Sequence, residues 1–128
     1  MKSFSDQIKQ CKEGAANNPF QGPDKKVVFV CSMGILRSAT AARIYAGKYN
    51  TRSAGTYDEA LIQLSPILVA WANELVFVNK ENFNMFQSRF EGDIPDALAI
   101  KVLDIPDCYE HMHPKLVEAF NVQYERVK

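Results

Sequence analysis

The sequence has few of the features that mark secreted, metal-dependent or membrane proteins. It contains three cysteines in 128 residues, too few and too scattered for a disulfide framework, and no paired Cys/His spacing typical of a zinc site. Its longest apolar run, Ile67–Ala72, is far shorter than a membrane span, and its first ten residues lack the apolar stretch of a signal peptide. We therefore expect a cytoplasmic protein with no metal, no cofactor and no membrane partner.

The chain has no excess of charge of either sign, since 15 Lys and Arg residues balance 15 Asp and Glu residues. Residues 1–56 carry nine basic side chains against three acidic ones, whereas residues 57–128 carry six against twelve. A neutral domain argues against nucleic acid as a partner, because nucleic-acid-binding domains are usually basic overall. The basic first half favours a small anionic ligand, although a solvated surface explains the same pattern.

The length and the 47% content of hydrophobic residues describe one globular domain that buries its own core. We expect a single domain over residues 1–128, with an N-terminal extension over residues 1–24 and an α/β core over residues 25–128. In the extension, Ser3–Gly14 has a capping box and an apolar stripe, which predict a helix.

Short apolar runs alternate with helical patterns along the core. The predicted strands are Val27–Cys31, 50–55, Leu75–Val78 and Ala97–Leu103. The predicted helices are Arg37–Ala46, Ile67–Asn73 after an N-cap at Ser65, one after Asn79 with Phe83, Phe86 and Phe90, and one from Pro114 with Leu116, Phe120, Tyr124 and Val127. This alternation predicts a small doubly wound parallel sheet of four strands, with helices on both faces and ligands at the carboxyl ends of the strands.

The segment between the first predicted strand and helix has the composition of a phosphate-binding loop: a cysteine, five residues, an arginine and a serine. Main-chain N–H groups in a strand-to-helix turn point inward, and the helix dipole adds partial positive charge. Gly34 permits left-handed backbone angles there. The residues predicted to hold phosphate are Ser32, Met33, Gly34, Ile35, Leu36, Arg37 and Ser38.

Cys31 is the predicted nucleophile of this loop, because amide dipoles and a nearby guanidinium favour the reactive thiolate. Arg37 is expected to hold two phosphate oxygens with its planar fork. We expect Ser38 to donate a hydrogen bond to the sulfur. A cysteine at the end of a buried strand is also explained as a small hydrophobic side chain.

Cleavage of a phosphate ester further needs a proton donor for the leaving oxygen. The segment Asp104–Tyr109 follows the fourth predicted strand, so its carboxyl groups belong to the same edge of the sheet as the loop. Asp107 is the predicted acid and Asp104 the alternative, while a turn beside Pro106 explains either aspartate structurally. His111 and His113 are candidates for touching substrate or tuning Asp107, or are solvated residues that precede the last helix.

Three segments, VVFVCSMGILRSATA, RSAGT and LDIPDCYEHMHPKLV, resemble the low-molecular-weight protein tyrosine phosphatase family, especially its short bacterial and phage-type members. The resemblance implies a phosphocysteine intermediate on Cys31 and an acid, Asp107, that protonates the tyrosine leaving group and then activates water. It implies that Tyr109 lines the aryl wall and that Ser53 supports the loop. The implied substrate is a phosphotyrosine-containing protein or a small aryl phosphate, with phosphate and vanadate as inhibitory oxyanions.

The chain departs from the family pattern at several positions. Gly34 stands where the family usually has an asparagine whose side chain helps to hold the loop, and Leu36 where it often has a second cysteine. Cys108 replaces the usual proline. An inert Cys108 and a regulatory disulfide between Cys31 and Cys108 both fit the sequence.

Three other functions share parts of the pattern. Arsenate reductases related to this family relay a disulfide through further cysteines, and this sequence offers only Cys11 and Cys108. Cellobiose-type IIB phosphocarriers have a similar strand and cysteine loop but lack the arginine and the paired acid. A phosphate-loop domain that only binds phosphorylated partners is the third alternative, which the altered loop favours.

Overall fold

The computed structural model describes residues 25–106 and 108–125, which form an α/β fold around one parallel sheet. The strands, in the spatial order β2-β1-β3-β4, are β1 (Lys26–Cys31), β2 (Asn50–Gly55), β3 (Glu74–Phe77) and β4 (Ala99–Val102). The predicted α/β class and four-stranded parallel sheet are confirmed. The helix predicted over Ser3–Gly14 lies outside the described residues, as do Cys11, Asp107 and Val127.

Four α-helices connect and follow the strands. They are α2 (Arg37–Ile44), α3 (Pro66–Trp71), α4 (Lys80–Arg89) and α5 (Pro114–Phe120), and a π-helical turn, η2 (Asn121–Glu125), extends the last. Ser65 and Asn79 cap α3 and α4 as predicted, because each side chain accepts a main-chain N–H three residues later. Within residues 25–106 and 108–125, no helix is long and apolar enough to span a membrane.

Several predicted boundaries differ from the structure by one or two residues. Helix α2 ends at Ile44 rather than Ala46, because Tyr45 leaves helical geometry at φ −102° and ψ 7°. Helix α3 ends at Trp71 because Ala72 is extended. Strand β4 is shorter than Ala97–Leu103, since β3 beside it offers four residues for pairing.

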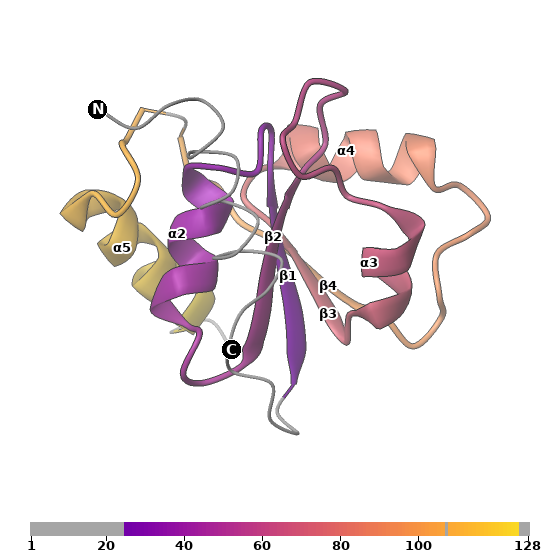
Figure 1. The fold of residues 1–128 in the computed structure, drawn as a ribbon, viewed down its shortest axis with the longest axis horizontal. Helices are drawn as coiled ribbons and strands as arrows, with labels where there is room; N and C mark the ends of the chain where they lie inside the picture. The colour runs from indigo at the N-terminus through magenta and orange to yellow at the C-terminus, as the bar shows by residue number, and fades with distance from the viewer. Residues whose placement is uncertain (1–24, 107, 126–128) are drawn as a thin grey trace.

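Side chains of β1 alternate between two cores, one on each face of the sheet. Val27, Phe29 and Cys31 belong to the core under α2 and α5, whereas Val28 and Val30 belong to the core under α3 and α4. Figure 1 shows these two pairs of helices on opposite sides of the strands. Because both faces are covered, β1 is apolar along almost its whole length rather than alternating with polar residues.

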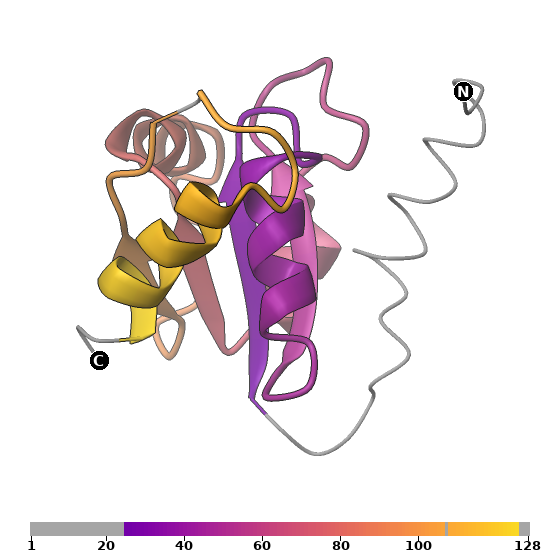
Figure 2. The same cartoon turned by 90° about the vertical axis from the view of Figure 1, so that its left-hand side faces the viewer.

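The loops that follow β1, β2 and β4 lie at one edge of the sheet, at the top of Figure 1, and the rotated view in Figure 2 agrees. All four strands are parallel, so this edge collects their carboxyl ends. Ligands of open parallel sheets bind at such an edge. The segments that carry the predicted loop and the predicted acid therefore start from the same edge.

Candidate functional site

Cys31 ends β1, and its sulfur lies within hydrogen-bond distance of two groups of the following loop. Its Sγ accepts the main-chain N–H of Gly34 at 3.1 Å and lies 3.0 Å from the Ser38 hydroxyl oxygen. The side chain is buried, with 2% of its surface exposed. Cys31 therefore lies at the base of the loop and is at the same time part of the core under α2 and α5.

The loop between Cys31 and α2 also presents main-chain N–H groups that the fold does not use. In the described part of the chain, no hydrogen bond starts from the N–H groups of Met33, Ile35 or Leu36. Helix α2 begins directly afterwards, at Arg37, with its partly positive N-terminal end toward the loop. This arrangement of donors suits an oxyanion.

Arg37 is buried, with 2% exposure, and two hydrogen bonds fix its guanidinium. Nη1 donates to the main-chain oxygen of Ile105 at 3.1 Å, and Nη2 donates to Ser32 Oγ at 3.3 Å. Ile105 lies just after β4, so Arg37 joins the loop to the segment that carries the predicted acid. The sequence identified Arg37 but not this contact, which spans 68 residues.

A line of hydroxyl groups connects the loop to β2. Ser38 Oγ donates to Ser53 Oγ at 3.3 Å, and Ser53 Oγ donates to the main-chain oxygen of Gly34 at 2.7 Å. Ser38 and Ser53 are fully buried. Ser53 thus contacts the loop that the resemblance expects it to support.

Gly34 and Gly55 let the loop lie directly against the end of β2. Gly34 has a φ of +79°, and a Cβ built on it would be 2.9 Å from main-chain atoms of Ala54 and Gly55. A Cβ on Gly55 would be 2.5 Å from the main-chain oxygen of Ser32. Gly34 therefore occupies a position with no room for a side chain.

Asn82 on α4 is a further contact of the loop that the sequence did not reveal. Its side chain is buried, and Nδ2 donates to Ser32 Oγ at 3.3 Å and to Thr56 Oγ1 at 2.8 Å. Its Oδ1 has no hydrogen-bond partner among the described residues. An asparagine three residues after a helix cap gives no local signal of such a role, because the sheet alone brings α4 to the loop.

The segment after β4 is only partly described. Asp107, the predicted acid, lies outside the described residues. The Asp104 side chain is exposed. The described hydrogen bonds of Asp104 join its main-chain N–H and oxygen to the side chain of Gln123 in η2, so they do not bring its carboxyl group to the loop. Tyr109 is half-buried with its ring 5.3 Å from that of His113.

The thiols of Cys31 and Cys108 are both free, Cys31 buried and Cys108 exposed, so the structure contains no disulfide between them. Cys108 also affects its neighbour in the chain. The charge of the Cys108 thiolate raises the pKa of Tyr109, with smaller contributions from desolvation and from a hydrogen bond to Cys108.

His111 joins the segment after β4 to α2 through a contact with Thr40. Its Nδ1 lies 3.4 Å from the Thr40 hydroxyl, which also accepts the main-chain N–H of Met112 at 2.8 Å. Burial lowers the pKa of His111, the positive charge of Arg43 lowers it further, and a hydrogen bond to the main chain of Leu36 partly opposes both. Burial and the charge of Arg43 therefore favour the neutral form of the His111 imidazole.

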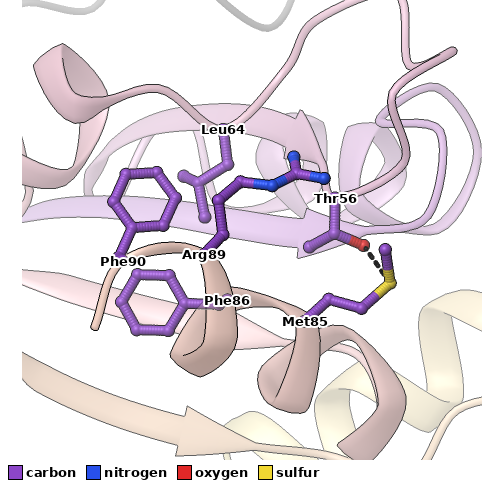
Figure 3. A pocket seen from close by; sticks show the side chains of 6 residues that line it. All are labelled: Thr56, Leu64, Met85, Phe86, Arg89 and Phe90. Atoms are coloured by element: carbon purple, nitrogen blue, oxygen red, sulfur yellow. Dashed lines mark hydrogen bonds between the residues drawn. The ribbon is translucent and has the colours of Figure 1, made fainter.

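A small hollow lies beside α4 (Figure 3). Its lining is mostly apolar and consists of Thr56, Leu64, Met85, Phe86, Arg89 and Phe90. The Thr56 hydroxyl donates to the sulfur of Met85 at 3.6 Å across it. None of the residues Cys31–Ser38 lines this hollow, although Thr56 of its lining donates its main-chain N–H to the Cys31 oxygen at 3.0 Å.

No protein-family model, curated protein or solved structure matches this chain. Its function is therefore inferred from the geometry of the loop and from the residues that contact it.

Substitution of Gly34 by alanine tests how closely the loop approaches β2. Gly34→Ala requires a left-handed residue with a Cβ and pushes that Cβ into main-chain atoms, so we expect a loss of about 2–4 kcal/mol in the free energy of unfolding. Gly92→Ala is the matched control, because Gly92 has a φ of +84° but open space around it. We expect it to cost about 1–2 kcal/mol in urea denaturation. Equal losses for the two variants would contradict the close approach.

The lowered pKa of His111 predicts a pH-dependent contribution to stability. Because the folded protein holds this proton more weakly than the unfolded chain, whose ordinary histidine pKa is 6.5, the contribution is complete above that pH. It is lost as the pH falls through the lowered pKa of the folded state. In urea denaturation between pH 7 and pH 5, the free energy of unfolding should fall more steeply for the wild type than for His111→Asn. Parallel profiles would show that His111 does not carry this dependence.

Proposed function

We propose that this protein is a cysteine-dependent phosphomonoesterase of the low-molecular-weight protein tyrosine phosphatase type. Its substrate would be phosphotyrosine in a protein or a small aryl phosphate. The observation that carries the proposal is the position of the Cys31 sulfur, which has the Gly34 N–H and the Ser38 hydroxyl within 3.1 Å. We also propose that the sheet is doubly wound and that Cys31–Ser38 binds the phosphate group.

The hydroxyl line through Ser38 supports a reactive thiolate. A serine hydroxyl has one proton, so while Ser38 donates to Ser53 it accepts the proton of the Cys31 thiol. When Cys31 is a thiolate, rotation of the Ser38 hydroxyl supplies a second donor to the sulfur beside the Gly34 N–H. Hydrogen bonds to a charged acceptor are stronger than those to a neutral one, so both stabilise the anion.

In the first step, the Cys31 thiolate attacks phosphorus in line with the ester oxygen. The S–P bond forms, the P–O bond breaks, and the leaving phenolate takes the proton of Asp107. In the second step, the Asp107 carboxylate takes a proton from water, whose oxygen attacks phosphorus and displaces the Cys31 thiolate. The products are the phenol and inorganic phosphate, and no metal ion or cofactor takes part.

The guanidinium of Arg37 would bind two oxygens of the transferred group and stabilise their charge in the transition state. Its bonds to Ile105 and Ser32 support this role, because they hold the planar group in one orientation before substrate binds. Tyr109 would contact the aryl ring of the substrate. The same donors would bind phosphate and vanadate, which we expect as competitive inhibitors.

Hydrolysis of p-nitrophenyl phosphate by the reduced protein tests the proposal. The wild type should turn over between pH 5 and pH 7, and Cys31→Ser should lower kcat at least 1,000-fold because a serine hydroxyl is a far weaker nucleophile at this pH (about 4 kcal/mol in activation free energy). Cys108→Ser is the control for a general effect of removing a thiol, since Cys108 is exposed. It should retain most of the activity.

A folded wild type without turnover would contradict the proposal. Stoichiometric binding of phosphotyrosine would then identify a binding domain, and a stable phosphocysteine accepted from another phosphoprotein would identify a phosphocarrier.

The identity of the acid is tested by leaving-group dependence. Asp107→Asn should lower kcat roughly 100-fold or more for phosphotyrosine, whose phenolate needs a proton, and several-fold less for p-nitrophenyl phosphate. Asp104→Asn, the matched control three residues earlier, should change neither rate by more than about twofold, because its side chain is exposed and its described contacts lie at η2. If Asp104→Asn shows the leaving-group pattern instead, the assignment of the acid is wrong.

A further inference from the structure

The hydroxyl of Ser32 receives two hydrogen bonds and gives none within the described residues. Arg37 Nη2 and Asn82 Nδ2 each donate to Ser32 Oγ at 3.3 Å. Both are groups that only donate, and a serine oxygen has two acceptor positions and one proton. The two bonds therefore occupy the acceptor positions, and the Ser32 proton points in a third direction.

An anion held by Arg37 would supply the acceptor for that proton. Ser32 follows Cys31 in the chain, is half-buried, and keeps its oxygen 3.3 Å from the guanidinium nitrogen. An oxygen atom bound at Nη2 lies within hydrogen-bond reach of the neighbouring hydroxyl. No main-chain or side-chain acceptor in the described part of the chain competes for the proton.

The contacts of Asn82 hold its side-chain amide in position to donate to Ser32. Its side chain is 1% exposed, a second bond to Thr56 at 2.8 Å anchors its amide, and its main-chain N–H is bound by Asn79. Its Oδ1 is buried without a partner among the described residues. A buried unpaired oxygen costs free energy, so stability alone does not explain an asparagine at this position.

We propose that Ser32 donates its hydroxyl proton to a non-bridging phosphoryl oxygen, and that Asn82 is the positioning residue that directs it. The inference rests on the proposed function and adds to it a side-chain donor and the helix that orients this donor. It also explains why α4 contacts the loop through a polar side chain.

The test compares inorganic phosphate as ligand across matched variants, by competitive inhibition of p-nitrophenyl phosphate hydrolysis and by direct calorimetric binding. Ser32→Ala removes the proton and should weaken phosphate binding roughly tenfold, as expected for a hydrogen bond to a charged acceptor. Asn82→Asp places an acceptor where a donor stood, so the Ser32 proton turns to the new carboxylate. It should weaken phosphate binding at least as much.

Asn84→Asp is the control for the added charge, because it puts the same group on the exposed side of α4. It should change phosphate affinity less than twofold. The double variant Ser32→Ala/Asn82→Asp should lose clearly less than the product of the two single losses, since both remove the same proton. A purely structural role of Asn82 would lower stability without this coupling, so urea denaturation accompanies each measurement.

Phosphate binding by Ser32→Ala within twofold of the wild type would overturn the inference, as would multiplicative losses in the double variant. With an active wild type, either outcome leaves the proposed function standing. A wild type that neither hydrolyses the ester nor binds phosphate would overturn both. If Asn82→Asp does not fold, Asn82→Ala replaces it, with an expected loss of about threefold that disappears in the Ser32→Ala background.

Discussion

Close contact between the loop after β1 and the end of β2 is the constraint on which the rest of the site depends. Two glycines meet there, and neither has room for a Cβ. The main-chain N–H groups of Thr56 and Tyr57 donate to the oxygens of Cys31 and Ser32, each at 3.0 Å. Main chain packed on main chain leaves the loop little freedom, so the Cys31 sulfur and the loop amides keep one geometry before any ligand binds.

The buried guanidinium of Arg37 connects the loop to segments that are distant in the sequence. A charge in the interior is tolerated when hydrogen bonds satisfy it, and the bonds to Ile105 and Ser32 do so on two sides. Ser32 in turn accepts from Asn82 on α4. The ends of β1 and β4 and helix α4 thus meet around one charged group.

Much of the fold followed from patterns in the sequence. Strands β1 and β3 were predictable because their residues are buried on both faces and read as short apolar runs, and the starts of α3 and α4 because Ser65 and Asn79 cap them. Gly34 was predicted to permit left-handed backbone angles, and its φ of +79° confirms this. The sequence did not reveal that this position has no room for a Cβ, or that Ser53 donates a hydrogen bond to the Gly34 carbonyl.

The candidate site combines residues that are neighbours in the sequence with residues that are far from them in the sequence. Cys31, Gly34, Arg37 and Ser38 stand within eight consecutive residues, so their association was readable from a single turn between a strand and a helix. Ser53, Asn82 and Ile105 join the site from 15 to 68 residues away. These contacts depend on strand order and register, which arise from packing of the whole sheet. The resemblance in sequence pointed to Ser53, but no local pattern pointed to Asn82 or Ile105. The residues of the candidate loop thus lie in one short segment of the sequence, whereas the tertiary structure decides that Asn82 and Ile105 contact it.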